Sequence, residues 1–341
     1  MNLSEKNIEA LKELLEGKKR VVILSHTNPD GDALGSSIAW KMALQRLGHQ
    51  VEAIVPNAYP YYLEWIPTIK DVIIYRNDEA GVAERAVAEA DIIFSLDFHT
   101  LSRLDALGDI IDRNQRATRV LIDHHLNPAE EFDIMFSYPE ASSTSYLIYC
   151  LIEQLWGAKS ITREQAEALY AGMMTDTGNF SFSTLTPHLF RAVANLAETG
   201  IDIPQLYNNV YNSFTEGRAR LFGYVINRKM KLLRKGTVAH LSLTEEEMRR
   251  FWFQQGDNEG FVNYPLTIKK MRLSAIFTEH HDFIRVSLRS RGRVDVNLFA
   301  QRYFNGGGHK NAAGGKSFVS MAETIKHFEK AVEEFAAEGL L

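Results

Sequence analysis

Short apolar runs alternate with amphipathic stretches through the first third of the chain. The runs are rich in β-branched residues, which is typical of buried strands, and they lie at 21–24, 51–55, 72–75, 91–96 and 119–122. Helical spacing covers 36–47, which ends at Gly48, and 79–90. Strands that alternate with helices predict βαβ units and a doubly wound, mostly parallel sheet with helices on both faces.

The pattern becomes predominantly helical after residue 141 and changes again after residue 235. Helical stretches lie at 143–156, 162–174, 187–199 and 216–233. A strand is predicted at 237–243, a hairpin at 273–278 and 283–288, and an amphipathic helix at 322–337. We therefore expect an N-terminal domain over 1–212, a helical linker over 213–235 and a smaller α+β domain over 236–341.

Composition narrows the class of protein. A chain of 341 residues with 45% hydrophobic and 24% charged residues is long and apolar enough for two globular domains. The N-terminal residues lack the basic start and continuous apolar core of a signal peptide, and no apolar run reaches the roughly 18 residues of a membrane span. The single cysteine, Cys150, excludes an internal disulfide. We expect a cytoplasmic protein that does not bind membranes.

The ends of the predicted strands carry carboxylates and imidazoles. His26, Asp30 and Asp32 follow the run at 21–24 within a Pro/Gly-containing loop, and ligands bind beyond the carboxyl ends of strands in open α/β sheets. Other strand and helix ends add Asp97, Asp123, His124, His125 and Asp176. Mixed imidazole and carboxylate ligands suit Mn²⁺, Fe²⁺ or Zn²⁺ better than Ca²⁺. Six of these residues are the candidate ligands: His26, Asp30, Asp32, Asp97, His124 and Asp176. Six ligands suit two ions, about 3.5–4 Å apart, that share a bridging carboxylate.

A glycine-rich segment near the C-terminus lies in a basic region. Gly306, Gly307 and Gly308 precede His309, and backbone N–H groups of such a segment can bind an anion. Residues 285–316 contain seven basic residues and one acidic residue, a local charge of +6 in a chain whose net charge is −5. A compact basic patch in an acidic protein indicates an anionic substrate, while the net charge argues against a broad DNA-binding face.

These motifs carry a family resemblance over about residues 10–335. The ordered set from His26 to Asp176 resembles that of the DHH phosphoesterase superfamily, and the segment 306–315 resembles the hallmark of the DHHA1 domain. The combination is similar to the nanoRNase/pAp phosphatase subfamily. The resemblance implies a DHH domain, a DHHA1 domain and an active-site cleft between them. It also implies two divalent ions, with Mn²⁺ ahead of Mg²⁺ or Co²⁺.

The resemblance further implies roles for individual residues. One ion would be bound by His26, Asp30 and Asp97, and the other by Asp32, Asp97, His124 and Asp176. His125 would face the substrate phosphate, and Asp123 would orient the neighbouring imidazole. The DHHA1 residues expected to contact the terminal phosphate or nucleotide are Arg289, Arg291, Gly306, Gly307, Gly308 and His309. Asn305 departs from the family pattern, because many relatives carry glycine there.

The implied substrates are short RNA oligonucleotides and 3′-phosphoadenosine 5′-phosphate (pAp). A linear or cyclic dinucleotide phosphodiesterase is the main alternative. The glycine-histidine segment argues against an inorganic pyrophosphatase, and the length argues against a RecJ-type exonuclease with an added nucleic-acid-binding domain. A non-catalytic nucleotide sensor is a further alternative, although all six candidate ligands are present. The apolar helices after residue 187 favour a homodimer.

Overall fold

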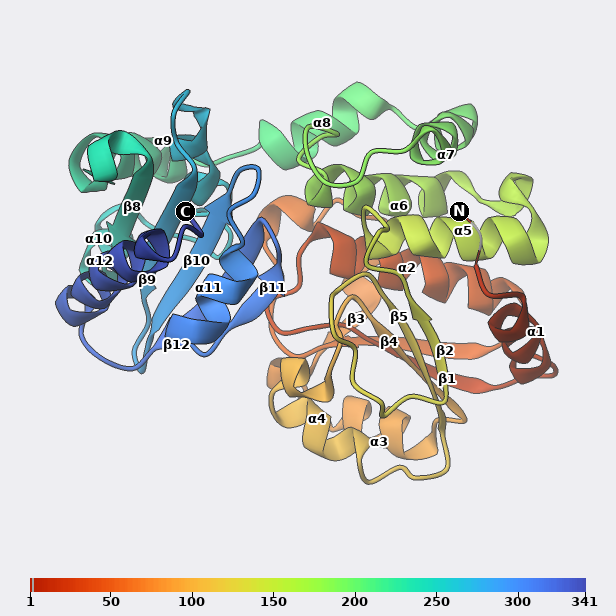
Figure 1. Ribbon diagram of the computed structural model, residues 1–341. Helices are drawn as coiled ribbons and strands as arrows, with labels where there is room; N and C mark the ends of the chain where they lie inside the picture. Colours follow the sequence, from red (N-terminus) through yellow and green to blue (C-terminus); the bar gives the residue numbers. More distant parts are fainter. Residues whose placement is uncertain (2) are drawn as a thin grey trace. The chain divides into compact units, whose positions relative to one another are not determined.

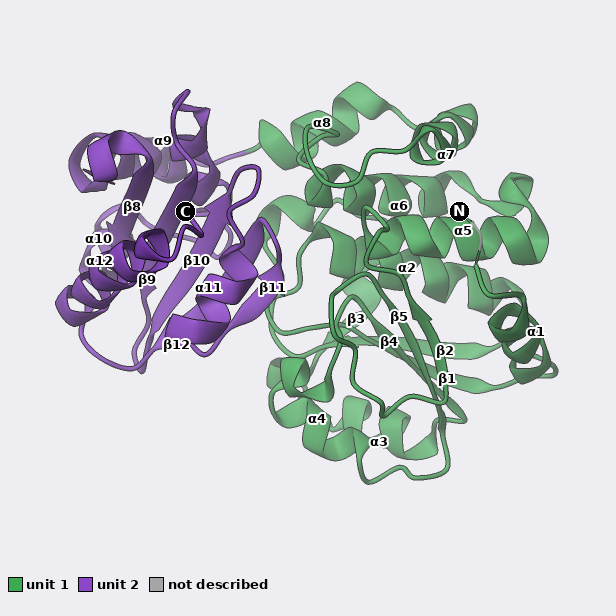
Figure 2. Cartoon of the chain, viewed as in Figure 1, with its two compact units in different colours: residues 1–213 green, residues 214–341 purple. Residues whose placement is uncertain are grey.

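The chain forms two compact units. A computed structural model describes residues 1 and 3–341, and these divide into Met1–Ser213 and Phe214–Leu341 (Figures 1 and 2). The segment 213–235, expected as a linker, therefore lies almost entirely in the second unit. Within that segment, helix α9 (Glu216–Tyr224) contributes Leu221 to an apolar cluster of the second unit.

The first unit is built on a six-stranded parallel sheet. Its strand order is β3-β2-β1-β4-β5-β6. The strands are β1 (Arg20–Leu24), β2 (Gln50–Val55), β3 (Val72–Ile74), β4 (Ile92–Leu96), β5 (Thr118–Asp123) and β6 (Ile134–Ser137). The order reverses between β1 and β4, so the carboxyl ends of these two strands flank a topological switch point.

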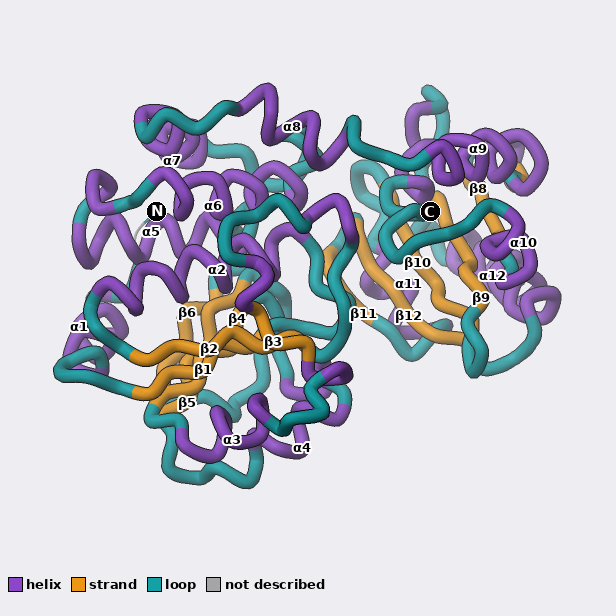
Figure 3. The backbone as a smooth tube through the Cα atoms, turned by 180° about the vertical axis from the view of Figure 1, so that it is seen from behind, coloured by secondary structure: helices purple, strands orange, loops and turns teal. Residues whose placement is uncertain are grey.

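Helices cover both faces of this sheet. The helices of the first unit are α1 (Glu5–Leu14), α2 (Gly31–Arg46), α3 (Val82–Glu89), α4 (Ala106–Ile111), α5 (Thr144–Trp156), α6 (Arg163–Asp176), α7 (Pro187–Glu198) and α8 (Ile203–Tyr211). One face packs against α2, α5 and α6, and the other against α3 and α4 (Figures 1 and 3). Apolar side chains alternate between these layers along β1, since Val21 and Ile23 join one cluster and Val22 and Leu24 the other. This confirms the predicted doubly wound sheet.

The second unit contains a mixed sheet with the order β11-β12-β10-β9-β8-β7. Its strands are β7 (Lys231–Leu233), β8 (Val238–Leu243), β9 (Leu273–Glu279), β10 (Ile284–Ser290), β11 (Gly307–His309) and β12 (Ala312–Ser317). The β8–β9 pair is parallel and the other pairs are antiparallel. Its remaining helices are α10 (Glu245–Arg250), α11 (Val296–Tyr303) and α12 (Met321–Ala337). The predicted smaller α+β unit is thus confirmed.

Two details of the second unit differ from the sequence expectation. The helix predicted over 216–233 is shorter, because α9 ends at Tyr224, a π-helical turn covers Val225–Lys229, and residues 231–233 pair with β8. Strand pairing overrides the local helical spacing there. The glycine-rich segment 306–315 forms parts of β11 and β12. Across residues 1 and 3–341, none of the helices combines the length and apolarity of a membrane crossing.

Candidate metal centre and substrate-binding residues

The loop after β1 presents His26 and Asp30. Asp30 caps α2, since its Oδ1 accepts hydrogen bonds from the backbone N–H groups of Asp32 (3.0 Å) and Ala33 (3.1 Å). His26 is buried, and its Nδ1 donates to the carbonyl of Thr27 at 2.9 Å. That bond places a proton on Nδ1 and turns Nε2 toward Asp97 Oδ2, which is 3.3 Å away.

Asp97 lies at the centre of the cluster, directly after β4. Its backbone has a φ of 65°, in the left-handed region that aspartate tolerates better than most residues. Its Oδ1 accepts a hydrogen bond from the Thr144 hydroxyl at 3.0 Å and lies 3.5 Å from His124 Nε2. The two oxygens of Asp97 therefore face two different imidazoles, one from each neighbouring strand end.

The first turn of α2 directs Asp32 onto the N-terminus of α5. One carboxylate oxygen accepts from the backbone N–H of Thr144 at 2.6 Å, and the other accepts from that of Ser145 at 2.8 Å. A helix N-terminus favours negative charge and has unpaired N–H groups, so this contact fixes the Asp32 side chain. The outcome is a buried carboxylate whose position depends on the packing of α2 against α5.

His124 and Asp176 complete the second side of the cluster. His124 Nδ1 donates to the carbonyl of Ala141 at 3.3 Å, which turns Nε2 toward the acidic cluster. This Nε2 lies 3.5 Å from Asp176 Oδ2 and 3.8 Å from Asp32 Oδ2. Asp176 is the last residue of α6. The His124 imidazole therefore faces carboxylates from the start of α2, the end of β4 and the end of α6.

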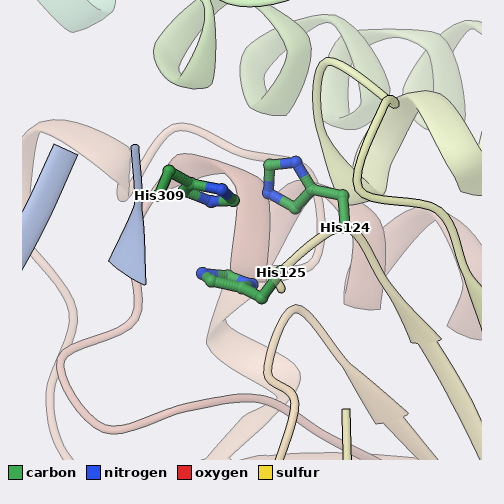
Figure 4. Close-up of side chains that lie close together, drawn as sticks. All are labelled: His124, His125 and His309. Atoms are coloured by element: carbon green, nitrogen blue, oxygen red, sulfur yellow. The ribbon is translucent and has the colours of Figure 1, made fainter. Parts of the chain in front are cut away.

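His125 and Asp123 form a separate pair beside this cluster. His125 Nδ1 and Asp123 Oδ1 are 2.7 Å apart, and Asp123 is fully buried. The rings of His124 and His125 meet at 71° with centroids 5.1 Å apart (Figure 4). The adjacent histidines therefore serve different neighbours, since His124 contacts the acidic cluster while His125 is fixed by Asp123.

Within the described residues, three groups of the first unit bring together side chains that could hold an ion. One is Asp97 with the Asp123–His125 pair, and the other two contain the expected ligands. His26, Asp30 and Asp97 have ligand atoms within 4.8 Å of one another, and so do Asp32, Asp97 and His124. Asp97 belongs to both groups. Oxygen and imidazole donors in two groups that share a carboxylate fit a pair of divalent transition-metal ions.

The charges of the cluster favour a bound cation. Burial raises the pKa of Asp32, and the nearby Asp97 and Asp176 carboxylates raise it further. Burial likewise raises the pKa of Asp176, to about 6. Burial opposes ionisation of Asp97, but hydrogen bonds from His124 and His26 outweigh it and hold the pKa of Asp97 well below its usual range. Divalent cations would relieve this repulsion among buried carboxylates.

The sequence did not reveal several neighbours of the cluster. Thr144 and Ser145 bind Asp97 and Asp32, although in sequence they read only as the start of a helix. Arg103 and His99 follow β4; burial lowers the pKa of His99, and the His125 and Arg103 charges lower it further. The sequence could have indicated His99 and Arg103 as neighbours of the cluster, because both follow Asp97 within six residues.

The candidate substrate-binding residues of the second unit gather at one end of its sheet. Arg289 pairs with Ala312, and Ala312 pairs with His309, so the three residues form one row on one face of β10, β12 and β11. The small side chain of Ala312 lies between Arg289 and His309 in this row. Arg285 shares the face of Arg289 by alternation, whereas Arg291 lies beyond the end of β10. Figure 4 includes His309.

The glycines of this segment allow close strand pairing. Gly307 and Gly308 lie in β11, and Gly306 immediately precedes it. A Cβ at Gly306 would lie 1.9 Å from the carbonyl oxygen of Gly314, so a larger residue could not pair there. Next to the row of His309, Gly307 pairs with Gly314, which leaves the sheet surface without side chains at that point.

Comparisons with known proteins agree with these features. The DHH family N-terminal domain matches residues 20–173, and the DHHA1 domain matches residues 241–338. A probable bifunctional oligoribonuclease and PAP phosphatase NrnA from Streptococcus mutans is 28% identical over 89% of this chain and 91% of its own length. The cyclic-di-AMP phosphodiesterase GdpP from Bacillus subtilis is 25% identical over 97% of this chain and 50% of its own length.

A solved structure extends the similarity to the whole fold. The crystal structure of an exopolyphosphatase-related protein from Bacteroides fragilis has a TM-score of 0.91 and 40% sequence identity. The match covers 98% of this chain and 97% of that chain. The chain belongs to the DHH family and carries a C-terminal DHHA1 domain.

Proposed function

We propose that this protein is a di-metal phosphoesterase that hydrolyses short RNA oligonucleotides and pAp. The observation that carries the proposal is the pair of ligand groups that share Asp97. The proposed ligands of one ion are His26, Asp30 and Asp97, and those of the other are Asp32, Asp97, His124 and Asp176. When bound, such ions lower the pKa of a coordinated water and neutralise charge on phosphate oxygens.

His125 is the proposed phosphate contact of the first unit. Asp123 accepts the Nδ1 proton of His125 and fixes the ring, and Nε2 is the nitrogen proposed to contact a substrate oxygen. When the ring carries its second proton, Nε2–H donates a hydrogen bond to the phosphate and stabilises the charge that develops there. Burial opposes ionisation of Asp123, yet the His125 charge and hydrogen bond hold the pKa of Asp123 below its usual value.

In the second unit, Arg289, Arg291, His309 and the glycines 306–308 are the proposed contacts of the terminal phosphate or nucleotide. A guanidinium and an imidazole in one row suit a doubly charged phosphate. In the reaction, the oxygen of water bonds to phosphorus and the bond from phosphorus to the nucleoside oxygen breaks. The leaving oxygen takes up a proton, and pAp yields AMP and inorganic phosphate.

A linear or cyclic dinucleotide phosphodiesterase is the second candidate. The similarity to GdpP over nearly all of this chain favours it, although this chain spans only half of that relative. The NrnA relative, in contrast, is matched over most of its length and is named for both activities of the first proposal. We therefore place the oligoribonuclease and pAp phosphatase activities first.

A side-by-side assay tests the proposal. Purified protein with Mn²⁺ would be offered pAp, pApA, a five-nucleotide RNA and a twenty-four-nucleotide RNA. We expect rapid turnover of pAp and both short RNAs and little turnover of the long strand. Activity confined to dinucleotides would support the second candidate. Metal binding without hydrolysis of any substrate would contradict both.

Three further properties belong to the proposal. Mn²⁺ is the preferred ion, and activity titrations with Mn²⁺, Mg²⁺ and Co²⁺ test that order. A homodimer is proposed from the apolar helices after residue 187, and light scattering of the purified protein tests it. A cytoplasmic location is proposed from the sequence, and cell fractionation tests it.

A further inference from the structure

A short segment after β4 lies beside the candidate metal centre. The 3₁₀ helix η4 (Leu101–Leu104) begins four residues after Asp97. The carbonyl of Arg103 accepts a hydrogen bond from the backbone N–H of Thr27 at 2.9 Å. This bond ties η4 to the loop that carries His26, so the backbone of Arg103 is held next to a proposed metal ligand.

Arg103 has a positive charge that the described residues do not neutralise. Its side chain is exposed, and no ion pair or side-chain hydrogen bond of Arg103 is found in residues 1 and 3–341. Arg119 of the same unit, in contrast, pairs with Asp112 at 3.1 Å. The charge of Arg103 acts on both His26 and His99. An unpaired guanidinium at the edge of an acidic cluster is suited to an anion that is not part of the chain.

His99 connects Arg103 with the proposed phosphate contact. The ring of His99 lies 5.8 Å from that of His125, with the planes tilted by 31°. Its Nδ1 is buried and has no hydrogen-bond partner among residues 1 and 3–341. A buried ring nitrogen without a partner is costly unless a ligand or water satisfies it. The rings of His125 and His99 thus lie together beside the centre, and the charge of Arg103 acts on His99.

We propose that Arg103 and His99 form a subsite that binds the phosphate group undergoing hydrolysis. Arg103 contacts a non-bridging phosphate oxygen, and His99 supports the same group beside His125. Planar guanidinium groups match phosphate oxygens geometrically, and they stabilise charge that grows in the transition state. This inference rests on the proposed phosphoesterase function and assigns two residues that belong to neither proposed ligand set.

Substitutions at Arg103 test the subsite by kinetics. Arg103→Ala should lower kcat/KM for pApA by about 10²- to 10³-fold, mainly through kcat, because removing one transition-state donor costs that much. Arg103→Lys should recover part of the loss, since it keeps the charge without the fork, and His99→Ala should cause a smaller loss. Arg113→Ala is the control, because Arg113 is also an exposed arginine that follows a helix of this unit. It should leave kcat/KM unchanged within about twofold, the range of ordinary surface substitutions.

Metal and phosphate binding separate the outcomes. Arg103→Ala should still bind Mn²⁺ as wild type does by calorimetry, and Mn²⁺-loaded Arg103→Ala should bind inorganic phosphate at least tenfold more weakly than wild type. Unchanged kinetics and phosphate affinity, or a parallel loss of Mn²⁺ binding, would overturn the subsite. If wild type binds phosphate through Arg103 but hydrolyses no nucleotide, the proposed function fails while the subsite stands.

Discussion

At the scale of single residues, Asp97 is the side chain on which the candidate centre depends most. It faces His26 with one oxygen and His124 with the other, and both proposed ligand groups contain it. Its left-handed backbone conformation holds it at the end of β4. Such backbone conformations persist where the surrounding structure determines them, and they are frequent at functional sites.

Replacing Asp97 should remove both ions at once. We expect Asp97→Asn to lower hydrolysis by more than the roughly 10- to 100-fold that outer partners of metal ligands cost. Calorimetry should show that Mn²⁺ binding weakens at both sites. Asp109→Asn is a matched control, since Asp109 is an exposed aspartate of α4. One site of unchanged affinity in Asp97→Asn would contradict the bridging assignment.

Asp123 offers a contrasting test, because it contacts His125 and belongs to neither proposed ligand set. Asp123→Asn replaces an acceptor of the His125 Nδ1 proton by an amide that can present a donor instead. We expect a loss of about 10- to 100-fold in kcat, with Mn²⁺ affinity close to that of wild type. Unchanged kcat would show that the pair does not orient a group used in hydrolysis.

At the scale of elements, the centre depends on the close packing of α2, α5 and α6. Gly172 of α6 leaves no room for a methyl group, since a Cβ would lie 1.9 Å from Ser145 Oγ and 2.8 Å from Asp32 Oδ1. These are the residues through which α5 fixes Asp32. Packing between helices therefore sets the position of a proposed metal ligand.

Gly172→Ala should reduce both stability and metal affinity. Overpacking of this kind costs about 1–3 kcal/mol, and the displaced Ser145 would shift Asp32. Urea unfolding and Mn²⁺ calorimetry measure the two effects. Gly223→Ala in α9 is the control, because a Cβ there has no neighbour within 4 Å and alanine favours helix. A Gly172→Ala variant as stable as wild type would contradict the packing argument.

The elements also show what sequence patterns could predict. Buried strands such as β1 and β4 were predictable, because their runs at 21–24 and 92–96 are apolar apart from Ser95. Asp97 and His124 were predictable from their place after such runs. The edge strand β6 was not predicted, since its four residues carry no distinctive period. The β11–β12 pair was not predicted because glycine-rich sequences favour turns, and only the close approach of two backbones explains it.

At the scale of the whole molecule, a buried cysteine thiol and several tyrosine hydroxyls make the free energy of unfolding depend on pH in the alkaline range. Burial raises the pKa of the Cys150 thiol to about 12 and that of Tyr211 to about 12. Burial also raises the pKa values of Tyr146 and Tyr149 above their usual range. In the unfolded chain these groups ionise near their ordinary values of about 8.5 for cysteine and 10 for tyrosine.

Stability should therefore fall as pH rises above about 9. Between that pH and about 12, the unfolded chain binds fewer protons than the folded chain, so the free energy of unfolding decreases with pH. Urea unfolding at a series of pH values measures the slope. Cys150→Ala should show a shallower slope, because one of the contributing groups is absent. A free energy of unfolding that stays constant from pH 9 to 12 would contradict the prediction.

The switch point between β1 and β4 also has a consequence for how the protein is made. The proposed ligands emerge during synthesis in the order 26, 30, 32, 97, 124 and 176. The strands β1, β4 and β5 that precede several of them are neighbours in the sheet, although β1 and β4 are far apart in the sequence. A ribosome-bound chain that ends before residue 176 lacks one ligand, and β1 cannot meet β4 until residues 92–96 are made. The proposed two-ion site can therefore be complete only after most of the N-terminal unit has been synthesised, and shorter nascent fragments should bind the ions more weakly.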